Sequence, residues 1–353
     1  VLADEAKIYG LIRTELTAVK ERFRDARRTE ITDDTVFYRP EDLIPDEQMV
    51  VTITHEGYIK RRNEAAYRSQ HRGGKGVTGV EPRQEDFVRH LFVAGTHDYF
   101  LFFTNRGKAY RLKVYEIPEA SRQARGTALV NLLRIGPEEH VAAVLPLKKF
   151  VSHRYVFLVT KRGVVKKVSL EAFATVRRDG IIAVDLPPGD ELVGAVETGG
   201  QGEILLVTQH GMAIRFSEAD VRPMGRAAYG VRGIRLREGD AVAGMAAVTE
   251  GKALVLITRR GYGKRTPLSE FRRQTRGGIG IVAAKVSAVS GPVAGVEVVS
   301  ESDEIMIVSA SGVLIRLKVH EIPVLGRAAR GVLVMRVGPD DSVATLARVV
   351  EEG

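Results

Sequence analysis

The 353-residue sequence contains no cysteine. Disulfide bonds, zinc sites built on thiolates and cysteine nucleophiles are therefore excluded, and the absence fits a reducing compartment. No stretch approaches the roughly eighteen apolar residues that a membrane helix requires, and the charged, amphipathic start does not resemble a signal peptide. We therefore expect a cytoplasmic protein that does not enter a membrane.

Catalytic groupings are also scarce. The eight histidines are scattered singly and none is paired at metal-ligand spacing, so we expect neither a metal site nor a catalytic residue. Acidic residues recur at similar places in the chain, and we interpret them as structural partners of nearby basic residues; they are Glu116, Glu171, Glu218, Glu270 and Glu321.

A short phrase occurs six times. An apolar run ends at Thr or Ser, two residues and a Gly follow, and the next run carries Lys or Arg; the glycines are Gly57, Gly107, Gly163, Gly211, Gly261 and Gly312. A period near 50 residues with short strands indicates a circular, propeller-like repeat protein. The absence of tryptophan argues against a sugar-binding or sialidase-type propeller.

The fourth residue after each of these glycines is basic in every copy. Lys and Arg make up 53 of 353 residues, so chance alone would place one there about one time in seven. We call these six residues the hairpin row, and predict that they form a belt around the ring; they are Arg61, Arg111, Lys167, Arg215, Arg265 and Arg316.

Each repeat is expected to contain four short strands. In the third copy they are residues 141–147, 155–160, 164–170 and 181–186, with a hairpin at Arg162-Gly163. We interpret the run at 342–350 as a surplus strand because it matches the strand that opens the later repeats. The simplest geometry has this strand complete the first blade and close the ring, which would remove exposed sheet edges.

The first residues predict a helix over positions 2 to about 24. Apolar side chains recur there at helical spacing, at Tyr9, Ile12, Leu16, Val19 and Phe23. The chain opens on Val1 rather than Met, so we expect a fragment of a longer protein. The domain prediction is a helix and linker at 1–34, followed by an all-β, six-bladed ring at 35–353.

The net charge of +9 favours a polyanionic partner such as nucleic acid. Basic residues are densest in the first repeat, and this stretch ends in Gln70-His71-Arg72-Gly73-Gly74-Lys75-Gly76. Three glycines in four positions let a backbone approach a ligand closely and point N–H groups at it. The composition suits a phosphate-binding loop that lacks the Walker A spacing; a flexible surface turn is the alternative.

Other basic residues lie on the same strands or in equivalent loops. With the hairpin row, they are predicted to bind DNA at the rim: Lys60, Arg62, Arg125, Arg177, Arg178, Arg276 and Arg330. A cationic belt contacts a duplex along its backbone and carries little information for reading bases. If roughly 6 to 12 phosphates are neutralised, log K should fall with log salt at a slope of about −5 to −10. The alternative is a solvated rim that binds no DNA.

Two other classes of function remain open. A protein-binding propeller would carry acidic or apolar loops on one face instead of a basic ring. An enzyme with its site in the central channel would need clustered carboxylates or histidines on the innermost strands.

The six repeats together with residues 70–76 strongly resemble the C-terminal domain of the DNA gyrase A protein family. Its diagnostic heptapeptide, the gyrase-A box, is Gln-Arg-Arg-Gly-Gly-Arg/Lys-Gly, and this sequence departs from it at His71 alone. A histidine is mostly neutral at pH 7, so one contact with phosphate would be weaker or pH-dependent. The first 31 residues resemble the helix and linker that leave the DNA-cleavage part of that protein.

The resemblance implies a β-pinwheel, a ring whose blades exchange strands. In the family this ring wraps duplex DNA, and the box is needed for the introduction of negative supercoils in an ATP-dependent reaction. By resemblance, residues 70–76 carry that role here. The fragment would be non-catalytic and bind no cofactor, with ATP and magnesium bound elsewhere in the parent type IIA topoisomerase.

The resemblance also implies partners and a location. The partners are double-stranded DNA, the N-terminal part of the gyrase A protein and the gyrase B protein in an A2B2 heterotetramer, in the bacterial cytoplasm near the nucleoid. The corresponding protein of topoisomerase IV is an alternative, but it usually has fewer blades and a degenerate box.

Overall fold

A computed structural model describes residues 4–25, 29, 40–54, 56–63, 88–121, 124–136, 138–311 and 313–349. The chain divides into two compact units, Val1–Leu43 and Ile44–Gly353. The predicted domain boundary between residues 34 and 35 lies outside the described residues and stays a prediction.

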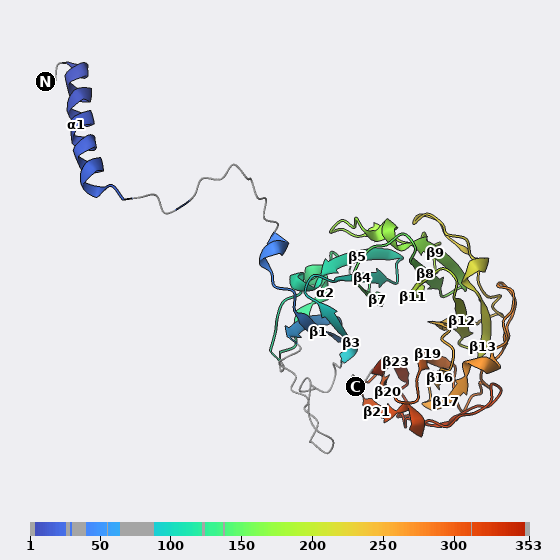
Figure 1. Cartoon of the computed structure of the whole chain (residues 1–353). Helices are drawn as coiled ribbons and strands as arrows, with labels where there is room; N and C mark the ends of the chain where they lie inside the picture. The colour runs from blue at the N-terminus through green and yellow to red at the C-terminus, as the bar shows by residue number, and fades with distance from the viewer. Residues whose placement is uncertain are drawn as a thin grey trace. The chain divides into compact units, whose positions relative to one another are not determined.

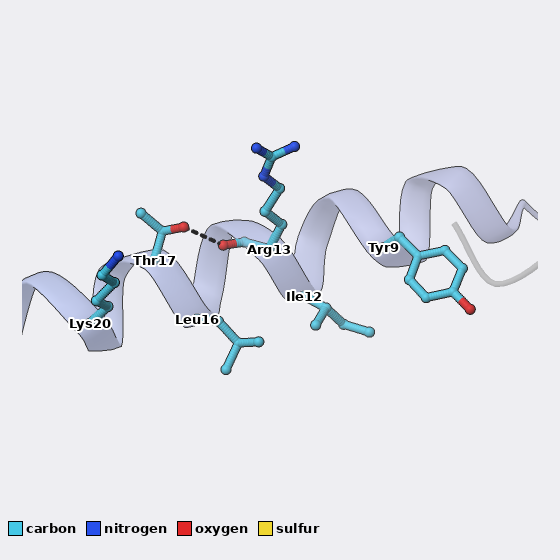
Figure 2. Close-up of a pocket in the computed structure, with 6 residues that line it drawn as sticks. All are labelled: Tyr9, Ile12, Arg13, Leu16, Thr17 and Lys20. Carbon is cyan, nitrogen blue, oxygen red and sulfur yellow. Dashed lines mark hydrogen bonds between the residues drawn. The ribbon is translucent and has the colours of Figure 1, made fainter. Parts of the chain in front are cut away.

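The first unit contains helix α1 (Glu5–Phe23) and the 3-10 turn η1 (Pro40–Leu43). Asp4 caps α1 by accepting a hydrogen bond from the backbone N–H of Ala6 at 3.1 Å, which satisfies one of the free donors at a helix start. The predicted helix is confirmed. Its apolar side chains are exposed within this unit, and Figure 2 shows Tyr9, Ile12 and Leu16 projecting from the helix on the side away from Arg13.

The second unit consists of six small antiparallel sheets, which we number as blades 1 to 6 (Figure 1). Each blade takes three strands from its own repeat. They are β1 (Gln48–Thr54), β2 (Tyr58–Asn63) and β3 (Val88–Gly95); β4 (Tyr99–Thr104), β5 (Lys108–Lys113) and β7 (Val141–Leu147); β8 (Tyr155–Thr160), β9 (Val164–Ser169) and β11 (Leu192–Thr198); β12 (Glu203–Thr208), β13 (Met212–Ser217) and β15 (Val242–Ala247); β16 (Ala253–Thr258), β17 (Tyr262–Pro267) and β19 (Val293–Val299); β20 (Glu304–Ser309), β21 (Leu314–Lys318) and β23 (Val343–Val349).

A two-residue strand from the following repeat completes each of the first five blades. We call these the exchanged strands: β6 (Thr127–Ala128) on β2, β10 (Ile181–Ile182) on β5, β14 (Val231–Arg232) on β9, β18 (Ile281–Val282) on β13 and β22 (Val332–Leu333) on β17. Among the described residues, blade 6 has three strands. The exchange links each blade to the next, as the predicted pinwheel requires.

The third strand of each repeat lies at the inner edge of its blade. Inner strands of successive blades pack together from β7 to β23, and β23 contacts β3, so this unit forms a ring (Figure 1). The prediction that the last strand completes blade 1 is wrong, because β23 pairs with β20 as the regular inner strand of blade 6. Likewise, β7 closes blade 2 and does not open blade 3.

The hydrophobic core lies between blades. In β12, Ile204 and Leu206 pack with blade 3, while Leu205 and Val207 pack with blade 5. All four are fully buried. Because successive residues of a strand point to opposite faces, a sheet between two neighbours requires an uninterrupted apolar run.

The recurring Thr-x-x-Gly phrase forms the hairpin turn. The Thr or Ser hydroxyl accepts a hydrogen bond from the backbone N–H four residues later in all six copies, as with Thr160 and Val164 at 3.3 Å. Gly163 takes φ +79°, a conformation that favours glycine. The turn sets the hairpin register, which places the hairpin row opposite the middle of each central strand, as Lys167 lies opposite Phe157.

Candidate nucleic-acid interface

The hairpin row lies on the second strand of each blade, and five of its six members reach across to the next blade. Each donates a hydrogen bond to a backbone carbonyl in, or directly after, the 3-10 turn that follows the next hairpin. These turns are η3 (Val114–Glu116), η4 (Leu170–Phe173), η5 (Glu218–Asp220), η6 (Leu268–Glu270) and η7 (Val319–Glu321). The pairs are Arg61 Nε with Ile117 (2.6 Å), Arg111 with Ala174, Lys167 Nζ with Glu218 (2.9 Å), Arg215 Nη1 with Leu268 (2.9 Å) and Arg265 Nε with Ile322 (2.7 Å). These hydrogen bonds tie the second strand of each blade to the 3-10 turn region of the next blade.

This placement limits how much of the row a ligand can reach. Lys167 is 4 % exposed, and the side chains of Arg215 and Arg265 are 18 % and 13 % exposed. Arg316, on blade 6, is more exposed and pairs with Glu304. The structure thus gives the row an inter-blade role that the sequence did not indicate, and its predicted contact with DNA stays a prediction.

A second set of cations, the buried lysines, precedes the hairpin row in blades 1, 3 and 5. Lys60 donates to the carbonyl of Ala124 at 2.8 Å, Lys166 to that of Ala228 at 2.7 Å and Lys264 to that of Gly326 at 2.8 Å. Burial lowers the pKa of Lys166 and Lys264 to about 8, and that of Lys60 in the same direction. The predicted DNA contact of Lys60 would require its ammonium to leave these carbonyls.

Two more of the predicted residues are Arg62, in blade 1, and Arg125, just before the exchanged strand β6. Arg62 lies on β2 opposite Val50. Arg125 pairs with Glu56, and its guanidinium lies 3.9 Å from the centre of the Tyr58 ring. Residues 70–76, which make up the predicted box, lie outside the described residues, so their predicted role stays a prediction.

The loops between each 3-10 turn and the exchanged strand, which we call the rim loops, present cations of a different kind. Arg177 and Arg178 are exposed, and within the described part of the chain their side chains form no ion pair or hydrogen bond. Arg177, Arg111 and Arg226 line a groove of about 930 Å³ beside the exchanged strand β10. Three guanidinium groups around one open groove can accept an anion such as a phosphate.

Two further predicted residues lie in later rim loops. Arg276 donates to the carbonyl of Asp220 at 2.9 Å and to that of Arg232 at 3.1 Å. Arg330 is exposed, and its guanidinium lies 5.1 Å from the centre of the Tyr262 ring. Arg330 is thus accessible to a ligand, whereas Arg276 is partly occupied by backbone carbonyls.

The structure adds a third row of cations that the sequence analysis missed. Arg235, Lys285 and Arg336 each lie five residues after the last glycine of a rim loop, and all three are exposed. The N–H of Arg235 donates to the carbonyl of Gly278 at 2.8 Å, which ties it to the next rim loop. The sequence repeats were aligned on the hairpin glycine. An alignment on the last glycine of each rim loop would have revealed this row.

The distribution of these cations around the ring is uneven. In blade 2, Arg106 pairs with Glu138 and Arg134 with Asp179. Unpaired exposed cations in the described ranges are concentrated in repeats 3 to 6, and include Arg177, Arg178, Arg222, Arg232, Arg235, Lys285 and Arg336. Among the described residues, the exposed cations without partners therefore lie mainly along one arc of the ring.

The described lining of the central channel has few groups that could catalyse a reaction. A cavity of about 510 Å³ there is lined mainly by small apolar side chains of the inner strands, together with Glu297, Lys252 and Arg348. Burial raises the pKa of Glu297 to about 7, although Arg348 opposes the shift. Glu297 is the one carboxylate lining this cavity, so clustered carboxylates are absent from its described lining.

Across all the residues that the structure describes, no group of three or more His, Asp or Glu is placed to hold a metal ion. Nor is any of the described helices long and apolar enough to cross a membrane.

The family model described as the DNA gyrase C-terminal domain, beta-propeller, matches six segments: 48–94, 98–148, 154–198, 202–249, 252–300 and 303–349. The chain belongs to the DNA gyrase C-terminal domain family. Each of the family's six matched segments corresponds to one repeat, which contributes three strands to its own blade. The resemblance and the predicted six-bladed fold are confirmed.

Relatives in this family match over the whole chain. The DNA gyrase A protein of Staphylococcus epidermidis (strain ATCC 12228) is 45% identical over 356 residues, and that of Staphylococcus aureus (strain MRSA252) is 44% identical over 359. Both alignments cover 100% of this chain and 40% of the relative. The chain thus spans about two fifths of the length of these relatives.

Solved structures of the family have the same ring. The C-terminal domain of DNA topoisomerase IV superposes with a TM-score of 0.75 at 28% identity, covering 87% of this chain and 94% of that one. The DNA gyrase A C-terminal domain gives a TM-score of 0.69 at 28% identity, covering 86% and 100%. The fold alone therefore does not separate the gyrase and topoisomerase IV branches, whereas the two relatives matched over the whole chain are gyrase proteins.

Proposed function

We propose that this ring binds duplex DNA along its outer edge without sequence preference and bends the duplex around itself. The observation that carries the proposal is the arc of exposed cations without acidic partners in repeats 3 to 6. Such cations attract the phosphate backbone and release its counterions on binding. The groove lined by Arg111, Arg177 and Arg226 supplies a concave contact on this arc.

Duplex DNA fits these surfaces better than single strands do. Proteins that bind single strands stack bases on exposed aromatic rings. Among the large apolar and aromatic residues of the described ring, Tyr229 is the one aromatic that is clearly exposed, at 38 %. A rim of arginines with so few exposed rings favours contact with a backbone.

Bending a duplex tightly requires many weak contacts. The persistence length of DNA is about 150 bp, so a tight wrap costs several kcal/mol, which distributed charge contacts must offset. The histone octamer uses the same strategy with arginines spaced along the path of the DNA.

In the parent protein, this wrapping would serve the ATP-dependent introduction of negative supercoils. The parent would be a DNA gyrase, a type IIA topoisomerase, in which the complete gyrase A protein assembles with the gyrase B protein as an A2B2 heterotetramer. ATP and magnesium would be bound elsewhere in the parent enzyme, where the B protein hydrolyses ATP, with no cofactor in the ring itself. Its location would be the bacterial cytoplasm near the nucleoid.

The test compares two charge reversals of equal size. Arg177→Glu with Arg178→Glu changes unpaired cations, whereas Arg106→Glu with Arg134→Glu changes cations that already pair with acids. We expect the first pair to weaken duplex binding at least about tenfold, or roughly 1.4 kcal/mol, and to reduce the change in linking number after ligation. The second pair should have a much smaller effect. Failure of the unaltered chain to bind duplex DNA at low salt would refute the proposal.

A role in topoisomerase IV is the second candidate, favoured by the TM-score of 0.75. Assays of the reassembled parent enzyme separate the two: negative supercoiling supports gyrase, and decatenation without supercoiling supports topoisomerase IV.

A further inference from the structure

The rim loop of repeat 5 repeats the composition of residues 70–76. It reads Gln274-Thr275-Arg276-Gly277-Gly278-Ile279-Gly280, and five of its seven residues match Gln70-His71-Arg72-Gly73-Gly74-Lys75-Gly76 at the same places. The corresponding loops of repeats 4 and 6, residues 224–230 and 325–331, match at two of seven. The loop of repeat 5 is therefore more similar to residues 70–76 than the loops of the neighbouring repeats are.

Backbone hydrogen bonds hold this loop against the strands and loop of repeat 4. The N–H of Gln274 donates to the carbonyl of Arg215 at 2.7 Å, and that of Gly277 to Gly233 at 2.6 Å. Gly280 takes φ +82°, and a Cβ there would lie 2.3 Å from the carbonyl oxygen of Ala213. The ends of the loop thus have fixed positions.

Gly278, in the middle of the loop, is not required by the fold. Its φ lies outside the left-handed region, and the nearest atom to an added Cβ would be Ile214 Cδ1 at 3.6 Å. The equivalent places in repeats 4 and 6 hold Ala228 and Ala329. A glycine that packing does not demand is explained by close approach of another molecule to the backbone.

The backbone around Gly278 has free donors. Among the described residues, the N–H groups of Gly278 and Ile279 donate to no protein acceptor. Two adjacent free N–H groups in a glycine turn are a recurrent way of holding an oxyanion.

Three arginines contact this loop or belong to it. The side-chain stem of Arg232 would lie 3.9 Å from a Cβ on Gly277, so its guanidinium extends from beside the loop. The Nη1 of Arg276 donates to the carbonyl of Arg232, and Arg235 is joined to Gly278 through its own N–H. The nearby Asp220 contacts Arg276 through its backbone carbonyl, and Arg273 pairs with Glu203.

We propose that the loop Gln274–Gly280 is a second site that grips a phosphodiester of the duplex, in addition to residues 70–76. The free N–H groups of Gly278 and Ile279 bind a phosphate oxygen, while Arg232, Arg235 and Arg276 supply the charge. Ile279 stands where Lys75 stands in the first repeat, so the second site has one cation fewer and grips less tightly. This inference rests on the proposed binding of duplex DNA.

The first test places one acidic residue at the same point of three repeats. Gly278→Asp puts a carboxylate beside the free N–H groups, and Ala228→Asp and Ala329→Asp put the same charge in rim loops without the glycine pair. All three positions are partly exposed. We expect Gly278→Asp to weaken duplex binding about tenfold more than either control, since a charge-assisted hydrogen bond contributes about that factor.

The second test adds a cation and does not depend on tolerance of the first variant. Ile279 is 45 % exposed, so Ile279→Lys leaves the core intact and restores the residue found at position 75. We expect severalfold tighter duplex binding than for Tyr229→Lys, which makes a comparable change in repeat 4. Equal losses in the three Asp variants, or equal gains in the two Lys variants, would overturn the second site and leave the proposed function standing. Absence of duplex binding by the unaltered chain would overturn both.

Discussion

At the scale of single residues, the surroundings of a cation determine what it can do. Lys264 and Arg178 carry the same charge in similar repeats. The ammonium of Lys264 is buried and bonded to backbone carbonyls of the next repeat, whereas the guanidinium of Arg178 is exposed and unpaired in the described structure. The first holds blades together, and the second remains available to a phosphate.

The buried lysines predict an unusual dependence of stability on pH. The pKa of Lys166 and Lys264 is about 8 in the ring, against an ordinary value of 10.5. Between these values the unfolded chain binds more protons than the folded ring, so the free energy of unfolding should rise as pH increases from about 8. Tyr110 acts in the opposite direction above pH 10, because burial and Glu139 raise its pKa to about 12. The window for the test is therefore about pH 8 to 10.

Urea unfolding across that window checks this prediction. Lys166→Met combined with Lys264→Met should abolish most of the rise, while Lys285→Met, at an exposed lysine, should leave it unchanged. A flat or falling stability curve for the unaltered ring would contradict the assignment of these lysines as buried cations.

At the scale of elements, the exchanged strands depend on one glycine in each rim loop. In repeat 4 this is Gly230, which takes φ +119° and whose added Cβ would lie 2.6 Å from the carbonyl oxygen of Val165. Equivalent glycines with positive φ precede the other exchanged strands, at Gly126, Gly180, Gly280 and Gly331. The glycine lets the loop turn closely against the preceding blade before pairing with it.

Two alanine substitutions within one loop test this role. Gly230→Ala should destabilise the ring by about 1–3 kcal/mol because of backbone strain and the clash. For Gly225→Ala, where an added Cβ meets nothing within 4 Å, the change should stay within about 1 kcal/mol. Denaturant unfolding measures both, and equal effects would show that the turn does not depend on Gly230.

At the scale of the whole molecule, successive blades are linked by the same two contacts from repeat to repeat. Each of the first five blades sends its hairpin-row cation forward to the next blade and receives an exchanged strand back from it. Arg316, in the last repeat, pairs instead with Glu304. The directional linkage divides the basic residues into those that build the ring and those that remain on its rim.

The exposed arc predicts the salt dependence of binding. If roughly 6 to 12 phosphates are neutralised, a plot of log K against log salt should have a slope of about −5 to −10. Arg177→Gln with Arg178→Gln should make the slope shallower by up to about 2. Titration of a labelled duplex at several salt concentrations measures both values, and a slope near zero would refute binding through the rim.

Local patterns were sufficient to predict much of the fold. The hairpins follow from the Thr-x-x-Gly turn, and the strands from apolar runs such as residues 204–207. Strand partners were harder to predict, because a cyclic repeat has no natural starting point. The inner strand of one blade and the first strand of the next are adjacent in sequence, so residues 141–147 were assigned to blade 3 although they belong to blade 2.

The sequence by itself determined the six repeats, the hairpin in each and the number and spacing of the cations, because turns and strand periodicity depend on neighbouring residues. Only the tertiary structure decided which cations are buried against carbonyls and which are exposed. That division depends on contacts between residues about 50 to 60 positions apart, such as Lys167 with Glu218. Such contacts form only when one blade packs against the next.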